Sequence, residues 1–196
     1  MCGRYALFLN PELRDLFLEM QKNNQKFNTG EIFPTDKAPI LMQEYNKLTP
    51  EAVKWGFPSY KGKSVIINAR AETAPLKPMF RNCILSSRCI IPSSGFYEWS
   101  HDGKKTKYLF TLPKSSTLYM AGLFRKFGDE TRFVILTTAA NDSMAEVHNR
   151  MPVVLNRERM GYWVNDTTAA LEILKEAPPE LMKTPEKDQN ISNNKK

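Results

Sequence analysis

Short runs of alternating apolar and polar residues recur along most of the chain, and a period of two is the pattern of strands with one buried face. The runs cover residues 40–45, 53–57, 65–68, 89–92, 95–99, 108–112, 118–123 and 133–137. Several are joined by short turn sequences such as His101-Asp102-Gly103. Because short turns connect antiparallel strands whereas parallel strands need long crossovers, this spacing predicts antiparallel pairing.

A helical period replaces the strand pattern in a few places. Asn10 and Pro11 form a typical cap and first helical position, and apolar residues at helical spacing follow them as far as Met20. Further helices are predicted at residues 142–147, 157–164 and 169–175. The whole pattern predicts an α+β fold with a mainly antiparallel curved sheet or β-barrel-like core and a few flanking helices.

The chain has 196 residues, which suffices for one domain with a continuous apolar core. We expect a single domain over residues 1–182 and a flexible polar tail over residues 183–196, where little can be buried. No apolar run approaches the ~20 residues of a membrane-spanning helix, and residues 1–5 lack the features of a secretory signal. We therefore expect a soluble cytoplasmic monomer with no membrane partner.

The chain carries 28 Lys and Arg against 21 Asp and Glu, a formal net charge of +7. This charge attracts polyanions and so favours nucleic acid, although many basic proteins bind none. Three cysteines without a Cys-x-x-Cys pair and two histidines far apart in sequence argue against a structural zinc site. We expect neither a metal nor an organic cofactor.

Cys2 is the first candidate for chemistry. Because the residue after Met1 is small, an aminopeptidase can remove Met1 and leave Cys2 as a free N-terminal cysteine. Its α-amine and thiol have ordinary pKa values of about 8 and about 8.5, so both are partly deprotonated near neutral pH. Such a 1,2-aminothiol captures an aldehyde, first as an imine and then as a thiazolidine ring. The alternative is a chance cysteine on a frayed terminus.

Three further segments carry candidate acid/base and binding groups. Glu98 lies among aromatic residues on a predicted strand, where burial would raise its pKa, unless strand alternation turns it toward water. His148 follows a predicted helix and suits proton transfer near pH 7, or is a structural histidine. Asn68 and Arg70 share one strand face and would hold an amine and a phosphate, unless Arg70 simply pairs with Glu72.

Taken together, these motifs resemble the SOS-response-associated peptidase family, whose members process abasic sites. The resemblance rests on Cys2-Gly3-Arg4-Tyr5, Asn68-Ala69-Arg70, Gly95-Phe96-Tyr97-Glu98-Trp99 and His148-Asn149-Arg150-Met151-Pro152. It implies a β-rich α+β fold and a covalent thiazolidine crosslink between mature Cys2 and the ring-opened abasic site in single-stranded DNA. It also implies that the crosslink shields the lesion during the DNA damage response.

The same resemblance implies residue roles. Cys2 is the nucleophile, Asn68 positions its amine, Glu98 is the acid/base group and His148 assists sugar ring opening and crosslink reversal. DNA contacts are implied for Arg4, Arg70, Arg150, Trp99 and Thr137. Aromatic stacking on bases is open to Trp55, Phe57, Tyr60 and Trp99, unless the two tryptophans are core residues. Nucleoid association when DNA is bound, self-removal of Met1 and β-elimination at the abasic site are further expectations.

Two segments depart from the family pattern. Glu31-Ile32-Phe33-Pro34 stands where an Asn-x-Ala-Pro motif is expected, and the polar C-terminal segment replaces the usual returning strand, which leaves that edge open or differently closed. Two other functions compete with aldehyde capture. One is a cysteine peptidase in which His148 activates Cys2. The other is a non-covalent single-stranded DNA-binding module with Cys2 incidental.

Overall fold

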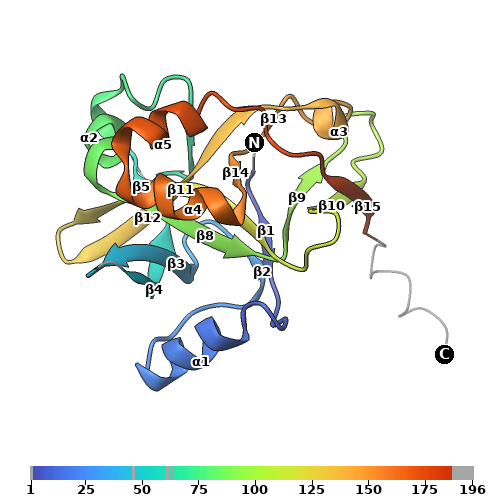
Figure 1. Cartoon of the computed structure of the whole chain (residues 1–196). Helices are drawn as coiled ribbons and strands as arrows, with labels where there is room; N and C mark the ends of the chain where they lie inside the picture. Colours follow the sequence, from blue (N-terminus) through green and yellow to red (C-terminus); the bar gives the residue numbers. More distant parts are fainter. Residues whose placement is uncertain (1, 46, 61, 63, 187–196) are drawn as a thin grey trace.

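The computed structural model describes residues 2–45, 47–60, 62 and 64–186 (Figure 1). The helices are α1 (Arg14–Lys22), α2 (Pro78–Ser86), α3 (Asp142–Ala145), α4 (Arg157–Asn165) and α5 (Thr167–Ile173). The strands are β1 (Tyr5–Leu7), β2 (Gly30–Ile32), β3 (Lys37–Glu44), β4 (Lys47–Trp55), β5 (Phe57–Pro58), β6 (Val65–Ile66), β7 (Asn68–Arg70), β8 (Arg88–Ser93), β9 (Gly95–Trp99), β10 (Lys107–Thr111), β11 (Leu118–Phe127), β12 (Glu130–Ala139), β13 (Arg150–Pro152), β14 (Val154–Leu155) and β15 (Met182–Pro185).

Five of these strands close into a barrel. The hydrogen-bonded path runs from β12 through β4, β3, β8 and β11, and the pairing of β11 with β12 completes the ring. The barrel interior is apolar and contains the fully buried side chains of Trp55 and Phe133, whose rings stack 6.2 Å apart. The expected α+β fold with a mainly antiparallel, barrel-like core is confirmed.

A second sheet carries the N-terminal segment, in the order β15-β10-β9-β1-β2. It is joined to the barrel where β8 runs directly into β9, and Ser94 between them donates its amide to the carbonyl of Ala6 in β1 (2.8 Å). Glycine is required at position 95, which has φ +155° and where a Cβ atom would lie 2.6 Å from the carbonyl oxygen of Phe110. The β8–β9 junction therefore fixes β1 against the barrel.

Two features of this architecture differ from the predictions. β12 pairs in parallel with β4 and with β7, because barrel closure brings together strands that are distant in sequence. The C-terminal edge is closed by β15, which pairs antiparallel with β10, so of the two expectations for this edge the open one is wrong. Residues 183–185 thus belong to a strand and not to a tail, and residues 187–196 lie outside the described part.

Helices α2, α4 and α5 lie together on one side of the barrel, and α1 lies apart from them (Figure 1). Arg88 at the start of β8 holds two of these helices together from within. Its buried guanidinium donates to carbonyl oxygens at the C-terminal end of α2 (Ile84, Leu85) and of α4 (Trp163, Val164). A positive charge near two helix C-termini also interacts favourably with the negative ends of the helix dipoles.

Replacing Arg88 by methionine should destabilise the protein strongly. The Arg88→Met change keeps the apolar stem but leaves buried helix-end carbonyls without donors, at a cost of roughly 3 kcal/mol or more in free energy of unfolding. Urea denaturation followed by circular dichroism measures this cost. Arg125→Met is the control, because this arginine is exposed and its guanidinium lies 5.3 Å from the Phe127 ring, and the change should cost less than about 0.5 kcal/mol. Equal stability of both variants would contradict the role given to Arg88.

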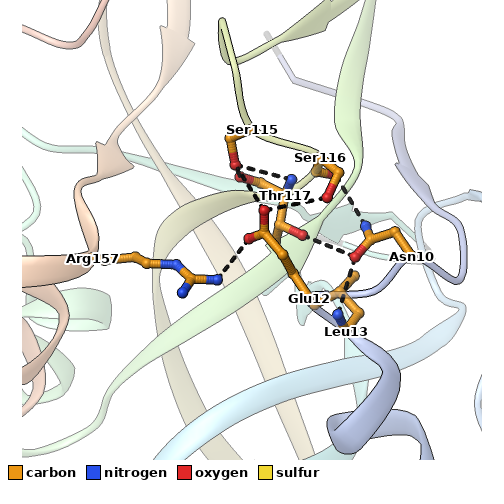
Figure 2. A network of polar contacts seen from close by, with 7 residues as sticks. All are labelled: Asn10, Glu12, Leu13, Ser115, Ser116, Thr117 and Arg157. Atoms are coloured by element: carbon orange, nitrogen blue, oxygen red, sulfur yellow. Dashed lines mark hydrogen bonds and ion pairs between the residues drawn. The ribbon is translucent and has the colours of Figure 1, made fainter.

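A polar network ties the segment before α1 to the rest of the molecule (Figure 2). The Glu12 carboxylate accepts from Arg157 of α4 (2.6 Å) and from Ser116 (3.3 Å) in the turn before β11. Asn10 caps the turn that precedes α1 by accepting from the amide of Leu13 (3.0 Å). The helix therefore begins later than its capping sequence suggests, at Arg14.

Within residues 2–45, 47–60, 62 and 64–186, no helix is both long and apolar enough to cross a membrane.

Candidate active site

Cys2 lies at the junction of the two sheets, just before β1, and is fully buried. The antiparallel pairing of β1 with β9 sets Tyr5 opposite Phe96, and the amide of Tyr97 donates to the carbonyl of Arg4 (2.9 Å). Continuing this register brings Glu98 alongside the segment that carries Cys2. Residues 2–4 thus continue the register of β1 beside β9, and the burial of Cys2 argues against the frayed-terminus alternative.

Burial changes the acid–base chemistry of both Cys2 and Glu98. Burial, followed by the nearby Glu98 charge, raises the pKa of the Cys2 thiol far above its ordinary value. Burial also raises the pKa of Glu98, whose exposed fraction is only 6%. Glu98 therefore does not face water, and the expectation that the thiol is partly deprotonated at neutral pH is wrong for the unprocessed chain. The two groups are a neutral thiol and a carboxyl group predisposed to carry a proton.

Asn68 reaches Cys2 from the barrel. Its Nδ2 donates to the Cys2 carbonyl oxygen (2.9 Å), while its Oδ1 is buried and accepts no hydrogen bond from any described residue. The strand β7 is positioned by its parallel pairing with β12 and by Trp55, whose Nε1 donates to the carbonyl of Ile67 (3.0 Å). An unsatisfied buried amide oxygen beside Cys2 is an acceptor available to an amine at this point.

Removing the Asn68 side-chain amide should slow any chemistry at Cys2 without unfolding the barrel. Asn68→Ala abolishes the bond to the Cys2 carbonyl, and the loss of one positioning hydrogen bond costs about 1.4 kcal/mol, or about tenfold in rate. Adduct formation with an aldehyde substrate is the measurement, and Asn82→Ala on the exposed face of α2 is the control. A rate equal to wild type would show that Asn68 does not position Cys2.

His148 comes from the short segment between α3 and β13. Its backbone amide donates to the carbonyl of Met144 (3.1 Å), and its ring Nδ1 accepts from the amide of Arg150 (2.9 Å). Burial lowers the pKa of His148, so the neutral ring prevails at neutral pH. The ring of His101 lies beside it, with centroids 5.7 Å apart. His101 has no predicted role, because nothing in a polar turn sequence indicates which distant residue it meets.

Some of the predicted DNA-contact residues are bound to other side chains of the protein, and others are exposed. Arg150 makes a two-point ion pair with Glu72 (2.6 and 2.9 Å) and also donates to the carbonyl of Thr137 (2.6 Å). Glu72 therefore pairs with Arg150 and not with Arg70, which is exposed at the end of β7. Thr137 is fully buried, and its carbonyl and hydroxyl oxygens both accept hydrogen bonds from Arg150, so it helps to hold that side chain.

Arg4 lies on an aromatic and acidic platform. Its guanidinium is 4.0 Å from the Phe33 ring centroid and 5.2 Å from that of Trp99, and its NH1 contacts a Glu31 oxygen (3.1 Å). Glu31 also binds Lys107 of β10 (2.9 Å). The segment that departs from the family pattern thus forms β2 beside β1 and holds Arg4, so this wall of the site is present in an altered form.

A groove adjoins Asn68 on the side of α2. Its lining includes Arg70, Lys77 and Tyr60, and the Tyr60 side chain is 85% exposed. Trp55 and Phe57, by contrast, are fully buried in the core. For Trp55 this agrees with the alternative that it is a core residue and not a base-stacking one. Trp99 is partly exposed under Arg4. Of the four aromatic candidates, only Tyr60 and Trp99 therefore present a ring surface to a ligand.

Comparisons with known proteins agree on one family. A family model described as SOS response associated peptidase (SRAP) matches residues 1–193. The abasic site processing protein YoqW of Bacillus subtilis is 36% identical over 183 residues, which is 84% of this chain and 80% of that protein. The abasic site processing protein YoaM of the same organism is 32% identical, covering 89% and 83%. A solved structure from Bacteroides thetaiotaomicron, 22% identical, shares the fold with a TM-score of 0.78 over 95% of this chain and 93% of that one.

Proposed function

The chain belongs to the SOS response associated peptidase family, and we propose that it is an enzyme that captures abasic sites in single-stranded DNA through a covalent bond to Cys2. The observation that carries the proposal is the convergence of Asn68 and Glu98, from two distant segments, on one buried cysteine. Asn68 bonds its carbonyl, the Glu98 charge acts on its thiol, and the His148–His101 pair lies close enough for the His101 charge to act on Glu98. The name of its relatives, abasic site processing protein, agrees with this chemistry.

The first step makes the aldehyde available. In the closed sugar, the bond from C1′ to the ring oxygen breaks, the ring oxygen gains a proton and the C1′ hydroxyl loses one. His148 suits this step, because Nδ1 accepts from the Arg150 amide and the neutral ring therefore carries its proton on Nε2, as a donor. His148 donates a proton to the ring oxygen, and Glu98 accepts the proton that the C1′ hydroxyl loses.

The second step joins Cys2 to C1′. The Cys2 amine, free after Met1 is removed, attacks the aldehyde carbon, and the resulting hydroxyl leaves as water after Glu98 donates a proton. The thiol then adds to the imine carbon and its proton passes to the nitrogen, which closes the thiazolidine. The net change is aldehyde plus aminothiol giving thiazolidine plus water, with no change in oxidation state.

The buried thiol favours one order of these bonds. Because burial raises the pKa of the Cys2 thiol and so disfavours the thiolate, the amine is the group proposed to attack first. The same burial disfavours the cysteine peptidase alternative, which needs a thiolate with a lowered pKa activated by a histidine. β-Elimination through the imine is a side reaction of the proposed enzyme. Met1 is removed before the reaction, either by the protein itself or by an aminopeptidase.

DNA binding uses the surface around Cys2. Arg70, Lys77 and Tyr60 line the groove beside Asn68, and they offer two phosphate partners and one stacking ring. Arg4 and Trp99 offer a second contact point on the other sheet. Single-stranded DNA that passes between these two surfaces would place the sugar of its abasic site at Cys2.

The proposal is tested by incubating the purified protein with a labelled single-stranded oligonucleotide that carries one abasic site. A slower band that survives boiling in detergent is expected. Borohydride reduction of the abasic aldehyde to an alcohol before mixing should abolish the band while leaving the charge of the DNA unchanged. A band of equal strength on the reduced or the undamaged oligonucleotide would instead support a non-covalent or non-specific DNA-binding module.

A further inference from the structure

The two histidines of the chain meet at the candidate site although they are distant in sequence. The rings of His101 and His148 lie with their centroids 5.7 Å apart and their planes tilted by 52°. His101 belongs to the turn between β9 and β10, two residues beyond Trp99, and is exposed, whereas His148 is partly buried. An exposed ring beside a shielded one is an arrangement in which the charge of the first acts on the second.

The turn that carries His101 is held in one conformation by its own polar groups. The amide of Ser100 donates to the carbonyl of Thr106 (2.9 Å), and the amide of Thr106 donates to Ser100 Oγ (3.0 Å). Ser100 Oγ in turn donates to Asp102 Oδ1 (2.6 Å), which also accepts from the amide of Lys104 (3.1 Å). Ser100 itself is buried. His101 therefore stands at a defined place near His148.

The hydrogen bond to His148 works only with a neutral ring. Its Nδ1 accepts from the amide of Arg150, so a proton added to Nδ1 would meet an N–H group and break the bond that orients the ring. A positive charge nearby opposes the addition of that proton. Burial lowers the pKa of His148 most, followed by the charge of the chain's N-terminal amine and then by the charge of His101.

Several other charged groups surround the pair, and most of them are already neutralised by a partner. Arg150 on β13 pairs with Glu72, and Glu146 at the end of α3 pairs with Lys183 of β15. Glu98 on β9 has a pKa raised by burial, against a smaller lowering by the charge of His101. On the turn itself lie Asp102, Lys104 and Lys105. The α-amine of mature Cys2 completes the set. His101 is the member of this set whose ring lies directly beside that of His148, with centroids 5.7 Å apart.

We propose that His101 is a positioning residue of the active site: its imidazolium, held beside His148 by the β9–β10 turn, keeps His148 neutral and bound to the Arg150 amide. The inference rests on the proposed function, since it is His148 that acts on the sugar. It gives the enzyme a wider acidic working range than His148 has alone. The chain's own sequence makes the test simple, because it contains no other histidine.

The first measurement is an NMR titration of the imidazole signals and needs no DNA. In His101→Gln the remaining signal belongs to His148, and it should titrate at a higher pH than in wild type. His101→Lys, which places a permanent positive charge on the same turn, should return the titration to or below the wild-type position. An unchanged titration in His101→Gln overturns the inference, and equal titrations in the Gln and Lys variants overturn its electrostatic cause.

The second measurement is the rate of adduct formation with the abasic oligonucleotide. His101→Gln should be roughly threefold slower than wild type at pH 5.5 and equal to it at pH 8, whereas His101→Lys should match wild type at both. An equal loss at pH 5.5 and 8 would show a structural role and overturn the inference. Absence of any wild-type adduct would overturn the proposed function, which the titration alone does not test.

Discussion

Cys2→Ala protein should form no boil-stable adduct with abasic single-stranded DNA, a loss of at least 100-fold relative to wild type. Alanine at position 2 still allows Met1 to be removed and still presents an α-amine, but without the sulfur an imine cannot close to a thiazolidine. The open imine hydrolyses readily, so it does not survive boiling. Denaturing gel electrophoresis of the labelled oligonucleotide measures the loss.

The same variant separates the two nucleophiles of Cys2. Borohydride added during the reaction reduces an imine to a stable amine, so Cys2→Ala should give a trapped adduct although it gives none without reductant. Cys83→Ala is the matched control, because Cys83 lies on α2 in an apolar cluster separate from the one that contains Cys2, and the variant should crosslink like wild type. A heat-stable adduct from Cys2→Ala without reductant would show that another residue attacks the aldehyde.

Glu98→Gln should slow adduct formation by roughly 10²- to 10⁴-fold, the usual contribution of a general acid/base. Glutamine keeps the shape and a hydrogen-bond donor but cannot give up a proton to the departing hydroxyl. The wild-type rate should be bell-shaped in pH, because it needs a neutral amine and a protonated Glu98 together. In the variant the alkaline fall should disappear, since only the amine titration remains. A flat wild-type profile between pH 5 and 9 would contradict the role of Glu98.

The stability of Glu98→Gln provides its folding control. Burial raises the pKa of Glu98 in the folded protein, so the folded state binds this proton more tightly than the unfolded state does. Stability from this group is therefore present at low pH and is lost as the pH rises from the unfolded pKa through the folded one. Glutamine removes that loss, so the variant should be at least as stable as wild type at pH 8. Thermal denaturation at pH 5 and pH 8 measures the difference.

The local pattern of apolar and polar residues predicted the fold class, but it could not predict which strands pair with one another. The expected strand at residues 95–99 coincides with β9. Its alternation of residues and the glycine at its first position are local signals that the sequence contains. Barrel closure through parallel pairing of β12 with β4 depends on long-range packing that no window of sequence contains. Helix α2 was overlooked although Pro78 at its first turn and buried Phe80, Cys83 and Ile84 at helical spacing indicate it.

At the candidate site, the residue types in the sequence indicated the chemistry, whereas the burial and the partners of these residues became visible only in the structure. The sequence singled out Cys2, Asn68, Glu98 and His148 as candidates, but it could not show that burial keeps the thiol neutral. It also could not assign Arg150 to Glu72, or place Thr137 beneath Arg150, since both depend on where β12 and β13 meet. Their catalytic and DNA-binding roles stay predictions.

Mass spectrometry of the boiled crosslink tests the central claim most directly. After nuclease and trypsin digestion, the modified peptide should be Cys2-Gly3-Arg4, with Met1 absent and a mass equal to peptide plus ring-opened sugar remnant minus one water. The thiol of that peptide should no longer react with an alkylating reagent, because the ring contains both sulfur and nitrogen. A modification on a lysine, or on Cys2 with its thiol still free to react, would contradict the proposed thiazolidine.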